Sequence, residues 1–378
     1  MTLSIAGTKR GESRRAERIA FVFGFRPWRS RLRHWLDNRS IYRFDNNLIA
    51  VAFALFIILL FRNKSEVYVW GFKHPAFLEI FCLRLGVPFI RVEDGFVRSI
   101  ALGRTGSTPL SLCFDRTGIY FDPSRPSDLE NIIQNYNFGA DSALKDRAQR
   151  CLGQLIAHRL SKYNTSPQAN VDDIYGPKNV KRILVLGQVE GDMSLIKGLD
   201  RAIDNNALVR IAVRENPGAQ VIYKPHPEVL YGTRREPPQS NPDDVRDICQ
   251  VLEQDIALSD TLQTIDHVYT MTSLSGFEAL IRGIKVTCLG APFYAGWGAT
   301  DDRQAIPRRT ARRSPLEIFA AAYILYPRYF DVRTGVRIEV EGALQLLGEM
   351  RSPGSTNTET DHFPSSVGKR YVGSNRLS

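Results

Sequence analysis

The sequence predicts an α/β protein of two domains, and three observations support this. The chain has 378 residues, more than a single hydrophobic core usually needs. In both halves, short apolar runs alternate with helix-like segments, a pattern typical of strand-helix-strand units on parallel sheets. A polar stretch with Pro and Gly, residues 163–179, separates the halves.

These observations divide the chain into five segments. We expect a basic arm and an apolar segment at residues 1–65, joined to a first domain at 66–165. A linker at 166–180 leads to a second domain with closing helices at 181–350. The tail, 351–378, is rich in Ser, Thr, Gly and Asn and is expected to be disordered.

The beginning of the chain is strongly basic. Residues 1–35 carry nine Lys or Arg against Glu12 and Glu17, a net charge of +7 within a total of +10. The basic residues are Lys9, Arg10, Arg14, Arg15, Arg18, Arg26, Arg29, Arg31 and Arg33. Such a run suits an anionic partner or a solvated flexible arm.

An uncharged run of fourteen residues, 48–61, follows this arm. It is shorter than the roughly 20 residues that a membrane-spanning helix needs. It therefore predicts either a buried helix or strand of the first domain or an interfacial membrane contact. The basic residues upstream would assist such a contact.

The five cysteines are scattered and form no CxxC pair, and no His stands at zinc-ligand spacing. They are Cys82, Cys113, Cys151, Cys249 and Cys288. This usage favours a reducing cytoplasm and no structural metal.

The elements of the first half are expected in the order strand, helix, strand. "EVYVWG" (66–71) and "VPFIRVEDG" (87–95) predict strands on either side of a helix at 75–86. Glu93 and Asp94 end the second of these strands, and Arg98 follows.

In the second half, four apolar runs predict strands at 182–187, 220–227, 267–273 and 285–290, with a helix at 274–283 before the last. A further helix begins after Ser314, an N-cap followed by Pro315 and by Glu317 at the capping-box position.

Polar residues follow these strands, at the sheet edge where α/β proteins bind ligands. They are Gln188, Glu190, Asp192, Lys224, His226, Thr272, Ser273, Ser275 and Gly276. A Ser-rich helix start is a plain cap or an anion site. Glu278 either forms a capping box with Ser275 or binds the ribose of a nucleotide. Tyr294 and Trp297 either flank a sugar or anchor the core.

No P-loop motif is present, and no GxGxxG follows a strand. A sugar nucleotide fits the polar residues better. Two Rossmann-like domains whose parallel sheets face an interdomain cleft, with a phosphate site and a nearby carboxylate, describe a GT-B-like glycosyltransferase.

Seven segments resemble, in order and spacing, the KpsC-type capsule-polysaccharide β-Kdo transferases. They are "RVEDGFVRSIALG" (91–103), "PLSLCFDRTGIYFDPSRPSDLE" (109–130), "LSKYN" (160–164), "GQVEGDMS" (187–194), "VIYKPHPEVL" (221–230), "TMTSLSGFEALIRG" (270–283) and "GAPFYAGWGATDD" (290–302). The resemblance covers about residues 66–330 and is stronger to the second KpsC module. KpsC carries two modules and this chain has room for one. Residues 1–65 and those after about 350 give no resemblance that can be used.

The resemblance implies a retaining transferase that uses CMP-β-Kdo and no cofactor. Its partners would be a lipid-linked Kdo acceptor and other capsule proteins rather than nucleic acid, at the cytoplasmic face of the inner membrane. The alternatives are a transferase for another nucleotide sugar and a non-catalytic capsule assembly or export factor.

The resemblance also implies roles for the strand-end residues. Asp192 would be the nucleophile, although it could instead be an N-cap, with Glu190 doing part of the work. The phosphate would be bound by Lys224, His226, Ser273, Ser275 and Gly276, the ribose by Glu278, and the sugar by Gln188, Glu190, Tyr294 and Trp297. Glu93 or Asp94 would deprotonate the acceptor, and Arg98 would bind a Kdo carboxylate or form a local ion pair.

Overall fold

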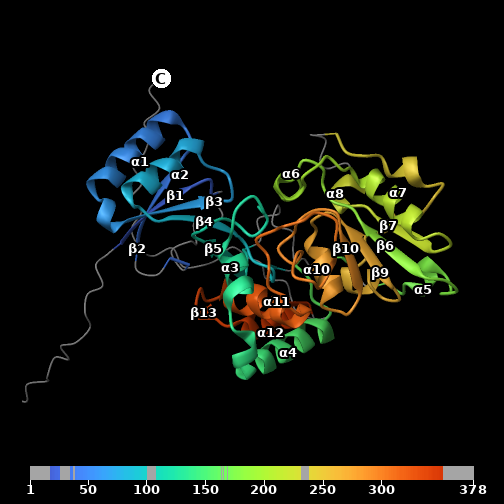
Figure 1. Cartoon of the computed structure of the whole chain (residues 1–378). Coiled ribbons are helices and arrows are strands. Elements are labelled where there is room, and N and C mark those ends of the chain that lie inside the picture. Colours follow the sequence, from blue (N-terminus) through green and yellow to red (C-terminus); the bar gives the residue numbers. More distant parts are fainter. Residues whose placement is uncertain are drawn as a thin grey trace, which may run out of the picture.

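The computed structural model contains two α/β domains, each built around its own sheet (Figure 1). It describes residues 18–25, 35–36, 39–99, 108–162, 164, 166–167, 169–230 and 238–351. Most of the basic arm and nearly all of the tail lie outside these residues, so the expectations of a flexible arm and a disordered tail are left open.

The first sheet has seven strands in the order β13-β12-β5-β4-β3-β1-β2. They are β1 (Arg18–Phe23), β2 (Arg39–Phe44), β3 (Ser65–Trp70), β4 (Phe89–Asp94), β5 (Ser111–Asp115), β12 (Pro327–Phe330) and β13 (Arg337–Ile338). β2, β1, β3 and β4 are parallel, whereas β5, β12 and β13 each run antiparallel to the preceding neighbour. The expected boundaries need correction, because this sheet begins before residue 66 and takes two strands from the segment expected in the second domain.

β1 lies inside the sheet because both of its faces are apolar. Phe21 and Phe23 pack toward the two helices on one side, and Ala20 and Val22 pack toward Trp35 on the other. The two helices are α1 (Leu48–Leu60), whose start is capped by the Asn47 side chain, and α2 (Ala76–Leu85). The short 3₁₀ turn Arg62–Lys64 follows α1.

The second sheet has six parallel strands in the order β11-β10-β9-β6-β7-β8. They are β6 (Arg182–Leu186), β7 (Gln220–Lys224), β8 (Gln250–Val251), β9 (His267–Thr270), β10 (Lys285–Cys288) and β11 (Asp301–Asp302). Helices α6 (Met193–Gly198) and α7 (Asn205–Glu215) pack on one face, and α10 (Leu274–Leu280) packs on the other. The sheet is therefore doubly wound, as predicted.

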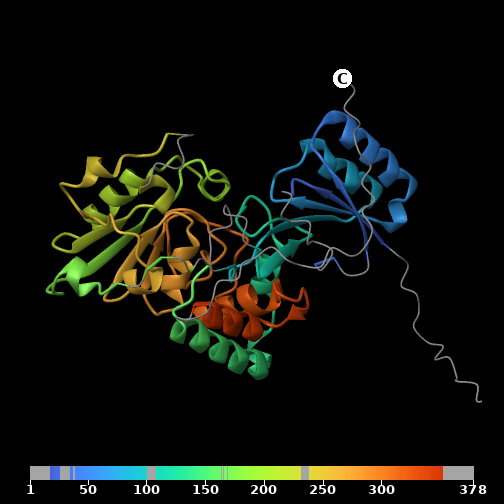
Figure 2. The ribbon, with the colours of Figure 1, turned by 180° about the vertical axis from the view of Figure 1, so that it is seen from behind.

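The remaining helical segments lie between these strands or after them in the chain. They are α3 (Asp128–Asn135), the 3₁₀ turn Phe138–Ala140, α4 (Ser142–Ala157), α5 (Asp172–Tyr175), α8 (Pro227–Leu230), the 3₁₀ turn Pro242–Val245, α9 (Leu258–Thr261), α11 (Pro315–Phe319), the π-helical segment Ala320–Leu325 and α12 (Val340–Arg351). α11 and α12 lie beside α4, below both sheets (Figure 2). The capping box that Ser314 and Glu317 were predicted to form is confirmed.

The predicted linker is not a free connector in its described part. Tyr175 is buried, and its hydroxyl donates to the Thr261 carbonyl at 3.1 Å. Arg182, at the start of β6, donates to the Gly176 carbonyl. The segment is therefore packed onto the second domain.

Candidate functional site at the ends of the second sheet

The order of the second sheet reverses between β6 and β9, because the chain adds β7 and β8 on one side and β10 and β11 on the other. In open α/β sheets, ligands bind beyond the carboxyl ends of the strands at this switch point. Here two loops meet: the Gln188 side chain donates to Thr272 Oγ1 at 3.0 Å and accepts from the Thr272 N–H at 2.7 Å. Gln188 thus ties together the loops that follow β6 and β9.

Two carboxylates follow β6 and have different surroundings. Glu190 accepts four hydrogen bonds, two from Asn205 and two from Ser240, at 2.6 to 3.0 Å. Asp192 is exposed and caps α6, accepting from the Met193 N–H at 2.7 Å. Glu190 therefore binds the loop after β6 to Asn205 and Ser240, whereas the carboxylate of Asp192 faces solvent.

Lys224 and His226 follow β7. Burial lowers the pKa of Lys224, whose ammonium donates to the Ile256 carbonyl at 3.2 Å. Nδ1 of His226 accepts from the Glu228 N–H at 3.1 Å, so in the neutral ring the proton resides on Nε2. This contact fixes the tautomer of the neutral His226 ring.

The start of α10 brings small residues next to the loop after β6. Ser273 is the N-cap, and its side chain accepts from the Ser275 N–H. Gly276 lies against Tyr294, since a Cβ added here would stand 2.3 Å from the Tyr294 hydroxyl oxygen. Only glycine fits this position without a shift of its neighbour.

Glu278 is buried inside the protein. Its Oε1 accepts from the Lys162 N–H at 3.1 Å, while Oε2 has no hydrogen-bond partner among the described residues. Burial raises the pKa of Glu278 to about 7. The capping box with Ser275 is wrong, because Ser273 is the N-cap and Glu278 lies beyond the first turn.

Tyr294 and Trp297 do not line a sugar site in this structure. Both are fully buried; the Tyr294 hydroxyl donates to the Ser273 carbonyl at 2.5 Å, and the Trp297 indole N–H donates to the Phe293 carbonyl at 2.8 Å. The expectation that they flank a sugar is corrected to the alternative of core anchors.

In the first domain, the predicted residues stand at the carboxyl end of β4. Arg98 is completely buried, and its Nε lies 2.7 Å from Asp94 Oδ2. Arg98 thus fixes its own loop, and its proposed contact with a Kdo carboxylate is not supported by this arrangement. Glu93 is half-buried beside Gly71, where an added Cβ would lie 3.2 Å from Glu93 Oε2.

One contact across the two domains was not expected from the sequence. The ammonium of Lys197, in α6, lies 4.9 Å from the ring centroid of Phe72, in the loop after β3. It brings the segment that carries Asp192 toward the carboxyl ends of the first sheet. The polar loop 71–75 after the strand "EVYVWG" could have been recognised by the same strand-end reasoning.

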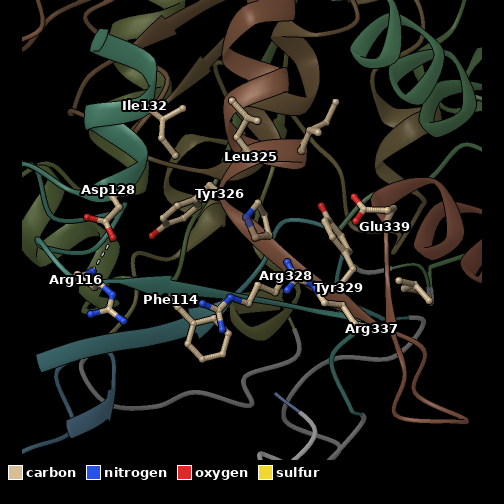
Figure 3. Close-up of a pocket in the computed structure, with 13 residues that line it drawn as sticks. Phe114, Arg116, Asp128, Ile132, Leu325, Tyr326, Arg328, Tyr329, Arg337 and Glu339 are labelled. Carbon is tan, nitrogen blue, oxygen red and sulfur yellow. Dashed lines mark hydrogen bonds between the residues drawn. The ribbon is translucent and has the colours of Figure 1, made fainter. Parts of the chain in front are cut away.

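The positions of two cavities also help to locate the site. An open hollow of about 510 Å³ adjoins the loop after β6 and is lined by Glu190, Gly191, Leu195, Ile196, Leu199, Asp200, Arg201, Ala202, Ile203 and Asp204. A second cavity, of about 340 Å³, lies between α3, the π-helical segment and the β5-β12-β13 edge (Figure 3). It contains none of the predicted residues, so we place the site at the switch point.

The two domains, one with a mixed sheet and one with a parallel sheet, carry polar residues at the carboxyl ends of their strands. This arrangement defines a GT-B-like α/β protein. A family model for capsule polysaccharide biosynthesis proteins matches residues 66–329, and the chain belongs to this family.

Relatives and solved structures agree with this membership. The chain is 46% identical over 331 residues to the lipopolysaccharide-processing protein LpsZ of Rhizobium meliloti, covering 87% of this chain and 74% of LpsZ. It is 40% identical over 286 residues to the capsule polysaccharide modification protein LipA of Neisseria meningitidis, covering 75% of this chain but only 39% of LipA.

Two solved structures of Thermosulfurimonas dismutans KpsC are similar over most of the chain. The β-Kdo 2,4 transferase matches with a TM-score of 0.72 and 32% identity, covering 87% of this chain and 98% of that one. The β-Kdo 2,7 transferase matches with a TM-score of 0.68 and 31% identity, covering 89% and 100%. The protein is thus related to KpsC Kdo transferases, and this similarity supports glycosyltransferase activity.

Proposed function

We propose that this protein is a retaining glycosyltransferase that moves β-Kdo from CMP-β-Kdo to a Kdo-terminated, lipid-linked acceptor in capsule biosynthesis. The observation that carries the proposal is the KpsC transferase similarity, which spans both domains at 32% identity. The exposed carboxylate at the switch point supplies a group suited to the chemistry.

In the proposed reaction, Asp192 attacks the anomeric carbon of Kdo and the bond to the CMP phosphate breaks. The electron pair leaves with CMP, and Kdo is held on the enzyme as an ester. An acceptor hydroxyl then attacks the same carbon, displaces Asp192 and gives its proton to Glu93. Two inversions restore the β configuration.

The other residues act on the nucleotide. In this proposal His226 donates from Nε2 to the phosphate, and the Ser273 and Ser275 hydroxyls at the start of α10 donate as well, because the Ser275 and Gly276 N–H groups are already bonded to Ser273. Glu278 is assigned to the ribose hydroxyls through its Oε2, which requires that donor binding open its buried position. The proposal needs no cofactor, because CMP is already a good leaving group. Lys224 would add long-range positive charge while it holds the Ile256 carbonyl.

The experiment supplies CMP-Kdo generated in situ and a short Kdo-terminated acceptor, and reads the product by mass spectrometry and its anomeric configuration by NMR. We expect one Kdo to be added with β configuration. Transfer only from another nucleotide sugar would favour a different GT-B transferase. Acceptor binding without transfer from any donor would indicate a non-catalytic assembly factor.

A further inference from the structure

The outer surface of α1 and α2 is unusually apolar. Among the described residues, fifteen large hydrophobic side chains are exposed, and nine belong to these two helices and the residue that caps α1. They are Ile49, Phe53, Phe56, Leu59, Leu60 and Phe61 on the first helix and Phe77, Ile80 and Leu83 on the second. We call this set the outer apolar face.

The face exists because α1 is apolar on both sides. Its inner residues Val51, Ala54 and Ile58 pack on the first sheet together with Leu78 of α2. The residues on its other side point away from the sheet, and α1 contains no charged residue. Clusters of exposed apolar side chains on a protein surface often mark interaction sites.

Basic side chains border the outer apolar face. Arg62 and Lys64 follow α1, and Arg84 lies in the last turn of α2; all three are exposed. Glu79 of α2 is already engaged by two arginines, at 2.5 and 2.7 Å. In the sequence, residues 1–35 have the same sign of charge, +7. An apolar surface with a positive border matches an anionic lipid bilayer.

The helices are suited to lie in the plane of such a bilayer. α1 has 13 residues, about 20 Å of helix, whereas the hydrocarbon core is about 30 Å thick. No helix of the described residues is long and apolar enough to cross a membrane. Helices with an apolar face and basic neighbours bind at the boundary between headgroups and acyl chains.

We propose that the outer apolar face docks on the surface of an anionic lipid bilayer, with Phe53, Phe56 and Leu83 entering the interface and Arg62, Lys64 and Arg84 binding lipid phosphates. A second copy of the chain would meet this face with the same positive border and would be repelled. The surface stands apart from the proposed transferase chemistry, because none of these residues belongs to the candidate site.

The test is flotation of the full-length protein with vesicles of phosphatidylcholine alone or with added phosphatidylglycerol, at low and high salt and without sugar donor. We expect binding to the anionic vesicles. A variant carrying Phe53→Gln, Phe56→Gln and Leu83→Gln should lose more than about tenfold in partition coefficient, since the buried apolar area is removed. The matched control, Ile156→Gln with Ile248→Gln, changes exposed apolar residues elsewhere and should bind like the parent protein.

A second variant, Arg62→Gln with Lys64→Gln and Arg84→Gln, should bind roughly a hundredfold more weakly at low salt, because each basic residue contributes about fivefold at an anionic surface. Circular dichroism checks that all variants are folded. Equal flotation of parent and apolar variant, or no flotation of the parent, would overturn the proposal. So would light scattering that shows a lipid-free dimer which the apolar variant converts to monomers.

Discussion

At the scale of single residues, the backbone N–H of Glu228 holds the neutral ring of His226 in one tautomer. The Glu228 N–H donates to Nδ1, so in the neutral ring the proton lies on Nε2, the atom that we propose donates to the phosphate. A hydrogen bond to a charged group contributes about 1.5–3 kcal/mol. The loss of CMP affinity on removal of the imidazole should therefore fall in this range.

We expect His226→Ala to weaken CMP binding by roughly ten- to a hundredfold and to slow transfer as well, measured by calorimetry and by the transfer assay. The control is His267→Ala. His267 is the first residue of β9, at the amino-terminal end of the strand and away from the proposed site, and its Nε2 lies 2.9 Å from Thr287 Oγ1. Unchanged CMP affinity in His226→Ala would show that the histidine is structural.

Glu278 predicts a pH dependence of stability. Its folded-state pKa is raised from 4.5 to about 7 by burial, so the folded protein keeps a proton that the unfolded chain has already lost. Stability from this group is thus greatest at low pH and falls as the pH rises from about 5 to 7, by about 3 kcal/mol.

Glu278→Gln removes this dependence. Urea denaturation of both proteins at pH 5 and pH 8 should show that the free energy of unfolding of the parent falls relative to the variant at pH 8. Parallel values at the two pH conditions would contradict the buried, protonated carboxyl.

Some residue assignments could be made from the sequence and others could not. Polar residues at strand ends predicted the positions of Asp192 and His226, because the ends of parallel strands share one edge. Tyr294 and Trp297 were ambiguous, since aromatic rings on a Gly-rich loop suit a sugar or a core equally. Burial alone separates the two possibilities.

At the scale of elements, the start of α10 depends on a close contact. A Cβ at position 276 would stand 2.3 Å from the Tyr294 hydroxyl. That hydroxyl is itself fixed on the Ser273 carbonyl. Tyr294 therefore positions the cap that is proposed to bind phosphate.

Gly276→Ala should lower the free energy of unfolding by about 1–3 kcal/mol and weaken CMP binding, and Tyr294→Phe in the same chain should restore part of both. Thermal melting and calorimetry measure these effects. Gly153→Ala, in the middle of α4 with open space around the new methyl group, should instead stabilise the protein by about 1 kcal/mol. Equal effects of the two substitutions would contradict the packing argument.

The sequence predicted most strands of the second sheet, and β3 and β4 of the first, because each is a short apolar run bounded by turns. It missed β1 and β2, since their short apolar runs stand among basic residues that were interpreted as an arm. It also missed β12, which begins with Pro327 and pairs with β5 more than two hundred residues earlier in the chain. Such distant pairing leaves no local pattern.

At the scale of the whole molecule, the C-terminal segments hold the two domains together. Arg308 and Arg309 both pair with Glu130 in α3. Phe96 of the first domain lies 4.8 Å, ring to ring, from Phe293 of the second. The domains share one apolar cluster that also includes α4, α11 and α12.

The place of β1 in the first sheet makes a prediction about truncation. Removing residues 1–35 deletes β1 and leaves β2 and β3 without their shared neighbour, so we expect insoluble protein or no cooperative melting. Removing only residues 1–17 leaves β1 intact and should preserve the melting temperature. A cooperative melt of the longer truncation, like that of the parent, would contradict the sheet order.

The central claim is that Kdo transfer takes place at the switch point of the second sheet, with Asp192 as the nucleophile. The most direct measurement compares Asp192→Asn with Asp244→Asn, which removes an exposed carboxylate elsewhere in the same domain, in the CMP-Kdo transfer assay and in CMP calorimetry. We predict that Asp192→Asn loses transfer while it binds CMP like the parent protein, and that Asp244→Asn retains both. In the parent protein, a slow acceptor should leave one Kdo on the peptide 182–197. Normal turnover by Asp192→Asn, with CMP binding unchanged in both variants, would contradict the account.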